Sequence, residues 1–450
     1  MDLRGQSRYS AVNLEFDRRR RFEEVSMPFV FRTARALSAL GSLACATVLA
    51  AAFVALSIAS QTAAAAEATP SETSIEQRIQ ALVPSLEEYI SANMKSFDVP
   101  GLASGIVAGD KLVYAKGFGV RTKGGAAAVD TQTLFQIGSA TKAFLSTTMA
   151  IAVDRGNLHW DDRIVDLDPD FQMRDPWVTR EFRVFDLMAQ RSGLPPYAND
   201  ILGFLGLDRS AQIRSWRYVD PVSSFRTTFA YTNITHILAG RIVARAEGAA
   251  DWNAVLQSEI LDPLGMTDTT YSAAAMTASA NHAVGHRYTV DGSVEVPFEQ
   301  LFPYDFDGSG DINSNIGDMA KWVSLQLAGG TTPGGQRIVS AENLAYTHTP
   351  KVAMSDKAFY ALGWVVQQTP NGDIVWHSGI TFGFGAIVAL QLDRNLGVIV
   401  HSNQSGFGMP GGRARHVDPR PSPRQPNGRP RGDGPCWSQD EICRRREAVR

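Results

Sequence analysis

The sequence predicts an α+β fold, in which an antiparallel β-sheet built from both termini is flanked by helices and interrupted by an inserted, mostly helical subdomain. Strand-like segments occur near the start of the globular part, from Leu102, and again near its end, from Asp373. The stretch between Trp177 and Tyr271 has mostly helical patterns, with loops rich in proline and glycine. Strands at opposite ends of a chain bury their apolar faces by joining one sheet, so we expect a single sheet formed by both ends.

Residues 1–66 are predicted to be a targeting region. Arg32 and Arg35 precede an apolar stretch at residues 36–59, and an Ala-x-Ala cleavage pattern follows it, which is the arrangement of an export signal peptide. Met27 is one hypothesis for the true start of this signal. The apolar stretch is also long enough to span a bilayer, so both a cleaved signal and a retained anchor fit the pattern.

Residues 67–78 are predicted to be a linker, and residues 79–405 one globular domain. Apolar residues have helical spacing from Ile79 to Phe97. The segment LASGIVAGDKLVYAKGFGV predicts a hairpin with its turn at Gly109-Asp110. Near the end of the domain, DIVWHSG, FGAIVALQL and LGVIVHSN have the pattern of strands, and a turn at residues 393–395 joins the last two.

Residues 406–450 contain ten arginines and seven prolines and are predicted to be a disordered tail, which resembles the product of an altered reading frame. The formal net charge of −3 gives no indication of a nucleic-acid partner. The cysteines Cys45, Cys436 and Cys443 all lie outside residues 67–405. This excludes a thiol nucleophile or a thiolate zinc site from the domain, and it suits an exported protein that relies on a large core.

Lys142 lies in FQIGSATKAFLSTTMAIAVDRG and is followed by a run without charge until Asp154. The uncharged run Ala143–Val153, closed by Gly156, predicts a helix that is buried almost all round. A buried ammonium is costly, so this lysine must be paired or have a lowered pKa. Ser139 lies one turn earlier on the same face, and a hydroxyl beside such a lysine is an activated nucleophile.

Ser139 also fits the simpler role of a helix N-cap. A capping box, however, would place Glu or Gln at the third position, where this chain has Lys142. Of the eight lysines in the chain, only Lys142 has a serine three residues before it. The free N–H groups at the start of a helix would also stabilise an oxyanion, so we predict catalysis at this serine.

A serine–lysine nucleophile needs a third group that passes the proton to the leaving group. Tyr231 and Asn233, in TTFAYTNITHILAGRIV, offer a phenol and an amide where a loop enters a helix. Tyr197-Ala198-Asn199 has the same spacing, so this pattern alone leaves two candidates. His377-Ser378-Gly379 adds a segment whose glycine lets a strand edge approach a ligand and whose following N–H can complete an oxyanion hole.

The ordered set Ser-x-x-Lys, Tyr-x-Asn and His-x-Gly resembles the signatures of the serine β-lactamase and penicillin-binding-protein superfamily. The likeness is greatest to the branch that contains class C β-lactamases, D-aminopeptidases and related esterases. It extends over about residues 80–403 and includes LFQIGSATKAF, LDPLGMTDTTY and INSNIGDMAKW. The resemblance implies a β-lactamase/transpeptidase-like fold, and it selects Tyr231 over Tyr197 because the family's tyrosine begins the long central helix.

The resemblance also implies roles for individual residues. The catalytic set is Ser139, Lys142 and Tyr231. The oxyanion-hole and substrate-binding set is Asn233, His377, Ser378, Gly379 and Ile380. The serine would be acylated, the lysine and tyrosine would exchange its proton, and the asparagine would contact the substrate amide. Backbone N–H groups of the serine and the isoleucine would hold the oxyanion.

Two departures from the family pattern bear on function. His377 stands where β-lactamases have a lysine near the substrate carboxylate, and a neutral imidazole holds a carboxylate less well than an ammonium does. This disfavours efficient β-lactam hydrolysis. The family also follows its last strand with a helix that packs on the sheet, and no such pattern begins at Gly406.

We therefore expect an exported serine hydrolase that cleaves ester or amide bonds in a small molecule or short peptide through an acyl-enzyme, as an esterase or a D-amino-acid peptidase. It would be periplasmic or extracellular, with membrane association only through an uncleaved signal. The alternatives are a β-lactamase or D,D-carboxypeptidase and, in another class, a non-catalytic penicillin-binding or wall-associated sensor. The intact Ser139, Lys142 and Tyr231 favour the enzyme. No cofactor and no nucleic-acid partner are expected.

The segment DFDGSGDINSNI, from Asp305, matches several positions of a calcium-binding loop. Ile316, however, stands where that loop requires a bidentate glutamate, and no helical pattern precedes the segment. We predict no metal here and instead a substrate-side loop before a helix at Asp318. The loops expected to set specificity surround Phe204, Trp216 and Phe302.

Overall fold

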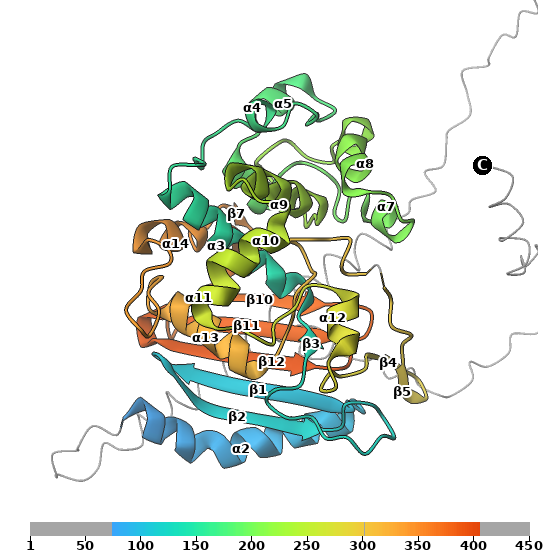
Figure 1. The fold of residues 1–450 in the computed structure, drawn as a ribbon, viewed down its shortest axis with the longest axis vertical. Helices are drawn as coiled ribbons and strands as arrows, with labels where there is room; N and C mark the ends of the chain where they lie inside the picture. Colours follow the sequence, from blue (N-terminus) through green and yellow to red (C-terminus); the bar gives the residue numbers. More distant parts are fainter. Residues whose placement is uncertain (1–73, 301, 406–450) are drawn as a thin grey trace, which may run out of the picture. The chain divides into compact units, whose positions relative to one another are not determined.

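The computed structural model describes residues 74–300 and 302–405, which form an eight-stranded antiparallel sheet with helices on both faces (Figure 1). Neighbouring strands follow the order β2-β1-β12-β11-β10-β9-β8-β7. The strand bounds are β1 Gly101–Ala108, β2 Lys111–Gly119, β7 Val352–Ala353, β8 Ala358–Tyr360, β9 Val365–Gln367, β10 Ile374–Ile380, β11 Gly385–Gln391 and β12 Leu396–Ser402. This architecture confirms the predicted α+β class.

The first long strand of the sheet pairs with the last. Leu102 of β1 lies opposite Ser402 of β12, and the register continues to Ala108 opposite Leu396. The sheet therefore joins segments from both ends of the domain, as the sequence predicts. The short strands β7, β8 and β9 extend it beyond the three predicted C-terminal strands.

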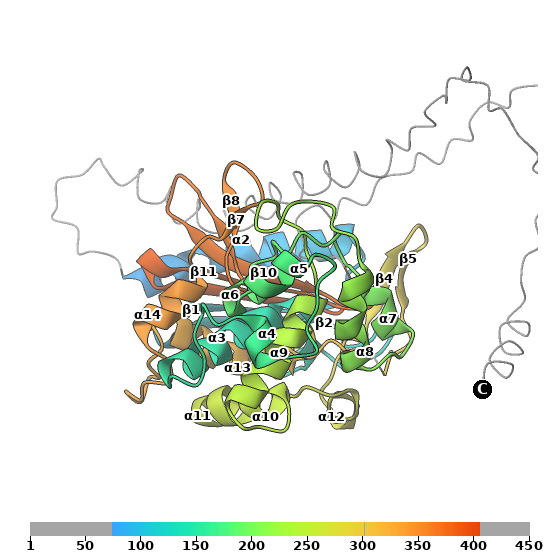
Figure 2. The ribbon, with the colours of Figure 1, turned by 90° about the horizontal axis from the view of Figure 1, so that it is seen from above.

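A mostly helical region lies between β2 and β7, and α4, α5, α8 and α9 lie beyond the β10 side of the sheet (Figure 1). Figure 2 shows α10, α11 and α12 on the side of the molecule opposite α2. The helices here are α4 Ile164–Leu167, α5 Pro176–Glu181, α6 Val184–Met188, α7 Asp200–Phe204, α8 Arg209–Arg214, η2 Ser215–Tyr218, α9 Ile234–Ala246, α10 Trp252–Leu256, η3 Gln257–Leu261, α11 Asp262–Leu264 and α12 Ala273–Ala278. The remaining elements are β3 Phe135–Gln136, which pairs with β6 Asn313–Ser314, the hairpin of β4 His286–Thr289 and β5 Gly292–Glu295, α14 Ala341–Thr347 and η4 Leu392–Arg394.

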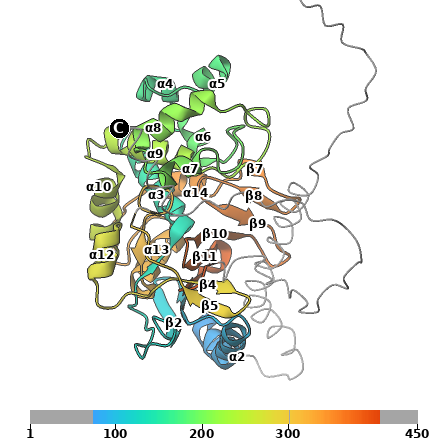
Figure 3. The same ribbon diagram turned by 90° about the vertical axis from the view of Figure 1, so that its right-hand side faces the viewer.

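Both faces of the sheet are covered because its strands carry apolar residues at consecutive positions, which point to opposite faces. On β12, Ile399 joins the main core, whereas Val398 and Val400 pack toward the other face. Helix α13, Ile316–Leu327, packs on β1 and β12 from the first face. Helix α2, Ile75–Ser96, covers β1 and β2 from the second, so the sheet lies between α13 and α2 (Figure 3).

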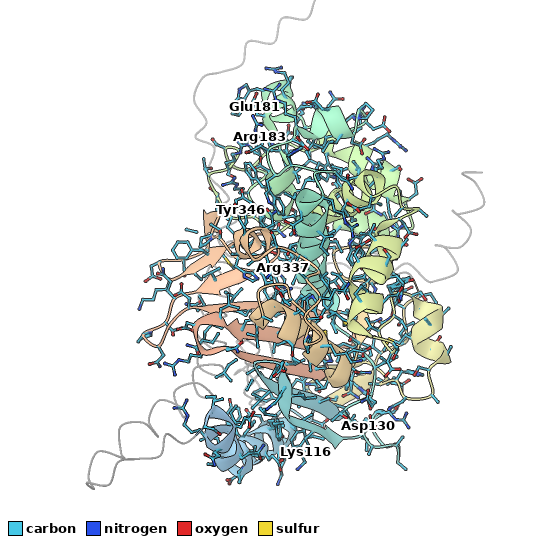
Figure 4. All side chains as sticks on the ribbon, turned by 60° about the vertical axis from the view of Figure 1, so that its left-hand side comes forward. Lys116, Asp130, Glu181, Arg183, Arg337 and Tyr346 are labelled. Carbon is cyan, nitrogen blue, oxygen red and sulfur yellow. The ribbon has the colours of Figure 1, made fainter. Side chains whose placement is uncertain are left out.

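Helix α2 begins with a capping box, because Ser74 Oγ accepts a hydrogen bond from Gln77 N at 3.2 Å and Gln77 Oε1 accepts one from Ser74 N at 3.0 Å. It therefore begins before the predicted start of the domain at Ile79. Lys116 of β2, labelled in Figure 4, donates to Glu87 of α2 at 2.5 Å. These contacts tie α2 to its face of the sheet.

Helix α3, Thr141–Asp154, is buried from its first residue to Ala152, as the uncharged run predicts. The ring of Phe144 stacks on that of Trp322 with centroids 4.0 Å apart, and Trp322 stacks in turn on Trp364 at 5.6 Å. Buried aromatic pairs hold their partners firmly. This stack therefore fixes the end of α3 that carries Lys142.

The predicted targeting region, residues 67–73 of the linker and the tail at 406–450 lie outside the described residues, and so do the three cysteines. Within residues 74–300 and 302–405, no helix combines the length and the hydropathy that crossing a membrane would need.

Candidate active site

Ser139 lies in a tight helical turn, η1 Gly138–Ala140, that leads directly into α3. The turn passes against the end of β10, and Gly138 adopts φ +50°. A Cβ at Gly138 would lie 2.9 Å from Ile380 N. Only glycine combines this backbone conformation with so close an approach. The local sequence thus places the seryl hydroxyl beside the backbone of the central sheet.

Lys142 lies one turn further on and is fully buried. Its Nζ is 3.2 Å from Ser139 Oγ, 2.7 Å from Asn233 Oδ1 and 2.8 Å from Ser309 O. Burial lowers the pKa of Lys142 from 10.5 to about 7, although the negative charge of Asp200 opposes this shift. At neutral pH this amine therefore exists in both its charged and its neutral form.

The hydrogen-bond partners of Lys142 Nζ determine which neighbour its lone pair faces when the amine is neutral. A neutral lysine has two N–H donors and one lone pair, and the two pure acceptors around Nζ are Asn233 Oδ1 and Ser309 O. When both accept, the lone pair of Lys142 is left for the third neighbour, Ser139 Oγ. The seryl hydroxyl then donates to the amine, which is the arrangement that a general base requires.

Asn233 is the residue before α9, yet its side chain does not cap that helix. Its Oδ1 accepts from Ser309 Oγ at 2.8 Å as well as from Lys142, and its Nδ2 donates to Asp200 Oδ2 at 2.7 Å. Because an ionised carboxylate only accepts hydrogen bonds, Asp200 fixes which end of the amide faces the lysine. The predicted contact of Asn233 with a substrate amide stays a prediction; in this structure its side chain holds Lys142.

Tyr231 lies beside the lysine, with Lys142 Nζ 4.9 Å from the centre of its ring. Burial and the neighbouring Tyr360 raise the pKa of Tyr231 well above 10.0, although a hydrogen bond with Ser139 opposes this rise. The phenol is therefore protonated at neutral pH. Tyr197, the rival in the sequence, is 61% exposed and donates its backbone N–H to Tyr231 O at 2.7 Å. The structure thus brings Tyr231, and not Tyr197, to the lysine.

The end of β10 supplies a backbone donor that faces the serine. Thr381 N donates to Phe384 O, so the next pair along the ladder, Ile380 with Gly385, is one that does not exchange hydrogen bonds. The N–H of Ile380 consequently points away from β11, toward the turn at Gly138. A Cβ at Gly379 would lie only 1.8 Å from Ile137 O and 2.9 Å from Ser139 N. The glycine is therefore what allows this approach.

His377 is 4% exposed, and both of its ring nitrogens are engaged within the protein. Nδ1 lies 2.6 Å from the carbonyl oxygen of Ser378, so it must carry the proton, and Nε2 accepts from the Tyr360 hydroxyl at 3.0 Å. Burial, with a contribution from the charge of Lys142, lowers the pKa of His377 to about 3. In this structure the ring therefore holds the end of β10 in place, and its expected contact with a substrate stays a prediction.

The segment that resembles a calcium loop forms the inner wall of the site. Ser309 contributes its carbonyl to Lys142. Burial raises the pKa of Asp307 to about 6 and that of Asp311 well above its ordinary value. In the part of the chain that the structure describes, no group of three or more His, Cys, Asp or Glu side chains is placed to hold a metal ion.

Sequence patterns alone do not single out Asp200, and they give no sign of the contact between Ser309 and Lys142. Asp200 follows the rival Tyr-x-Asn pattern directly, which is the one local signal that could have pointed to it. Of the three residues expected near the specificity loops, Phe204 and Phe302 are in contact, with ring centroids 5.2 Å apart. Trp216 is instead buried in the core, 1% exposed, and the expected role of the loop around it stays a prediction.

The larger of two cavities in the described part of the chain does not coincide with this chemistry. A cavity of about 630 Å³ is lined by Leu207, Asp208, Arg209, Ser210, Arg214 and Asp305. Its lining includes neither Ser139 nor Lys142. We place the site by its serine–lysine contact, because that contact carries a reactive group and the cavity lining does not.

Comparison with known proteins places the chain in a family. Residues 86–418 match the family model described as Beta-lactamase. The chain belongs to the beta-lactamase family. This confirms the superfamily that the ordered motifs indicated.

Relatives within the family include hydrolases and penicillin-binding proteins. The chain is 29% identical over 333 residues to unguisins hydrolase ungD' of Aspergillus campestris. The aligned part covers 70% of this chain and 60% of that protein. It is 27% identical over 288 residues to penicillin-binding protein 4 of Amycolatopsis lactamdurans, covering 62% and 73%. The chain thus spans less than two thirds of the length of the unguisins hydrolase.

A solved structure confirms the fold. The octameric penicillin-binding protein homologue from Pyrococcus abyssi superposes with a TM-score of 0.63 at 24% sequence identity, covering 73% of this chain and 74% of that one. The large antiparallel sheet and its covering helices are therefore those of the penicillin-binding-protein fold.

Proposed function

We propose that this member of the beta-lactamase family is a serine hydrolase that cleaves ester or amide bonds through an acyl-enzyme on Ser139, as an esterase or a D-amino-acid peptidase. The observation that carries the proposal is the 3.2 Å contact between Ser139 Oγ and Nζ of the buried Lys142. With a pKa of about 7, much of this lysine is neutral at physiological pH and is able to accept the seryl proton. Relatives named as hydrolases support the same activity.

In the proposed acylation, the proton of Ser139 Oγ passes to Lys142 Nζ while Oγ bonds to the carbonyl carbon of the substrate. The carbonyl electrons move to its oxygen, where the N–H groups of Ser139 and Ile380 stabilise the negative charge. On collapse, the bond to the leaving oxygen or nitrogen breaks, and the leaving group takes the proton of the Tyr231 hydroxyl. Lys142 then returns its proton to Tyr231.

Deacylation repeats these transfers with water. A water oxygen bonds to the acyl carbon, and its proton reaches the neutral Lys142 through the Tyr231 hydroxyl. The bond to Ser139 Oγ breaks, and the seryl oxygen recovers a proton from the lysine. The raised pKa of Tyr231 supports a relay through a protonated phenol and leaves the role of base to Lys142.

The surroundings of the site favour neutral substrates over β-lactams. A β-lactam carboxylate needs a cation beside the acylated serine. His377 occupies the position of the family's lysine, but its pKa of about 3 keeps it uncharged, and both of its nitrogens are engaged. We therefore propose that esters and short D-amino-acid peptides react faster than β-lactams do.

The test is intact-mass detection of an acyl adduct after incubation with chromogenic short-chain esters, D-amino-acid amides and β-lactams. We expect one acyl group per chain and none in Ser139→Ala. Ser96→Ala is the matched control, because Ser96 Oγ bonds only to Ala92 O at the end of α2. A folded protein that no electrophile labels, or a label that survives in Ser139→Ala, would overturn the proposal.

The same experiment separates the enzyme from a non-catalytic binder. An enzyme releases chromogenic product in many equivalents per chain. A penicillin-binding or wall-associated sensor would give one equivalent and a stable adduct. Turnover therefore decides between these two functions of the same serine.

We also propose that the protein is exported, with residues 1–66 as the targeting region. The proposal is supported by the two arginines, the apolar stretch and the Ala-x-Ala pattern. N-terminal sequencing of the protein from a periplasmic or culture fraction tests it. Recovery of the full-length chain in the cytoplasm alone would contradict it.

A further inference from the structure

Four phenylalanine rings from three segments form a cluster at the surface, which we call the aromatic rim: Phe204, Phe302, Phe306 and Phe382. The ring centroids of Phe302 and Phe382 are 4.4 Å apart, and that of Phe204 lies 5.2 Å from the first and 5.5 Å from the second. Phe306 is buried beneath them, but Phe204 is 40% exposed and Phe382 is 47% exposed. A contiguous apolar patch on a protein surface marks a binding site.

The first segment of the rim is tied to the catalytic lysine. Helix α7 ends at Phe204 and begins at Asp200. Asp200 accepts a hydrogen bond from Asn233 Nδ2, and Asn233 Oδ1 accepts from Lys142 Nζ. Two hydrogen bonds and one short helix therefore connect the exposed ring to the proposed base.

The other two segments are tied to the site as closely. Phe306 lies three positions before Ser309 in the sequence, and the carbonyl of Ser309 accepts a hydrogen bond from Lys142 Nζ. Phe382 follows Ile380, the residue whose N–H faces the serine, by two positions. All three segments of the rim thus converge on the groups that would surround the reacting carbonyl.

The chain segments that carry Phe204 and Phe382, and the residues just before α7, have further exposed apolar side chains. These exposed residues, with their exposed fractions, are Tyr197 61%, Ile201 60%, Leu205 67% and Ile380 40%. The cavity that borders Phe302 and Phe382 measures only about 20 Å³, which holds one water molecule at most. A ligand would therefore lie on the open face of the rim.

We propose that the aromatic rim is the subsite for an apolar group, an alkyl chain or an aromatic ring, that the substrate carries next to the scissile carbonyl. This inference rests on the proposed acylation of Ser139 and names the substrate class of that site. Aromatic rings bind such groups through large contact areas at low entropic cost. The apolar group belongs either to the acyl part or to the leaving group, and the experiment distinguishes the two.

The substrate is favoured over a bilayer as the occupant of the rim. Docking on an anionic membrane surface relies on basic residues around an apolar patch. Near the rim, Arg209 is paired with Asp307 at 2.9 Å, and its chain neighbour Asp208 is acidic. Hydrogen bonds and short chain segments join the rim to Lys142, and a surface that only contacts a membrane would not require such links to the lysine.

The experiment measures kcat/KM for two ester series. In one series the acyl chain of p-nitrophenyl esters grows from acetate to octanoate; in the other, acetate is esterified to alcohols of increasing length. Burying one methylene group raises kcat/KM about threefold to fourfold. We expect this gain per methylene in one of the two series and a flat response in the other.

Variants of the rim test whether the selectivity for long chains depends on its phenylalanine rings. Phe204→Ala and Phe382→Ala are expected to reduce the gain per methylene to less than twofold while acetate is still cleaved. Tyr89→Ala is the matched control, because Tyr89 is 43% exposed on α2, across the sheet from α13, and the gain should persist in it. A full gain in both rim variants would overturn the inference.

A binding measurement separates this inference from the proposed function. Calorimetry of Ser139→Ala with N-methyl alkanamides and with N-alkyl acetamides, each with chains of two to eight carbons, should give affinities that rise with chain length in one of the two series, and Phe382→Ala should abolish the rise. A rise in affinity without any ester hydrolysis would support the rim and refute the proposed function. Hydrolysis with no chain-length dependence in either assay would refute the rim alone. Binding to phosphatidylcholine–phosphatidylglycerol vesicles that Phe382→Ala abolishes, with no chain-length dependence, would assign the rim to a membrane and overturn the inference.

Discussion

Replacing Lys142 with methionine removes a buried amine while keeping the length of the side chain. Burial lowers the pKa of this lysine from 10.5 in the unfolded chain to about 7 in the folded protein. At about 1.36 kcal/mol per pH unit, this interval corresponds to about 4 kcal/mol of lost stability at pH 7. The lysine is therefore expected to make the folded protein less stable than its methionine variant at this pH.

The loss of hydrogen bonds offsets part of this gain. Methionine leaves Ser309 O without its donor, which costs about 1–3 kcal/mol. Asn233 Oδ1 still accepts from Ser309 Oγ at 2.8 Å, so it stays paired. The net expectation is that Lys142→Met is more stable than the parent protein by about 1–3 kcal/mol at pH 7 and is inactive on esters.

The pH dependence gives the sharper test. Between pH 7 and 10.5 the unfolded chain binds the proton that the folded protein has released, so the parent protein gains stability with rising pH, by about 1.4 kcal/mol per pH unit. The destabilisation caused by burying Lys142 is complete below about pH 7 and disappears above pH 10.5. The advantage of Lys142→Met should therefore shrink as pH rises and reverse between about pH 8 and 10, where the remaining destabilisation equals the cost of about 1–3 kcal/mol for the lost hydrogen bond.

Urea unfolding followed by tryptophan fluorescence at several values between pH 6 and 10 measures this difference. Lys111→Met, a substitution of an exposed lysine on β2, is the control for the loss of a lysine charge. A difference between Lys142→Met and the parent protein that stays constant with pH, or a variant that is the less stable of the two at pH 6, would refute the reasoning.

Three other perturbations test the same structure. The acylation rate should rise with pH through about 7, because only neutral Lys142 accepts a proton. Asp200→Asn removes a carboxylate that raises the pKa of Lys142, so the midpoint of the pH–rate profile should move to lower pH. An unmoved midpoint would show that the charge of Asp200 does not influence the lysine. Gly379→Ala places a methyl group 1.8 Å from Ile137 O, so ester hydrolysis should fall about 100-fold or more in a variant whose fold is checked by circular dichroism; parent-like rates would show that the approach is not needed. Asp186→Ala strips a fully buried carboxylate from two arginines and should lower the free energy of unfolding by about 3–5 kcal/mol in urea titrations, whereas a loss below about 1 kcal/mol would mean that the ion pairs contribute little.

The sequence was most informative where periodicity and burial coincide. The uncharged run after Lys142 could only be a buried helix, and α3 is buried as predicted. Short apolar runs rich in β-branched residues, bounded by turn residues, predicted β10, β11 and β12 almost to their ends. The short strands β7, β8 and β9 were not predicted, because strands of two or three residues are too brief to show a period.

The site was predictable only in part, because sequence patterns identify side chains better than contacts. Ser139 and Lys142 were found because a lysine in an apolar run is rare. Ser309 acts through its carbonyl, a group that every residue carries, so no pattern could select it. The ring of Trp216 lies edge-on to Phe171 at 5.7 Å in the core, a contact between distant residues that no local pattern reveals.

The pairing of β1 with β12 also sets when the protein can fold. A ribosome releases the segment with Ser139 and Lys142 long before it releases Ile380, and β1 has no partner on one side until Ser402 emerges. Contacts so distant along the chain form slowly, because loop closure must precede them. Under the proposed function, a nascent chain carries the hydroxyl and the amine without their oxyanion donor, so it does not react with substrate until translation of the domain is complete.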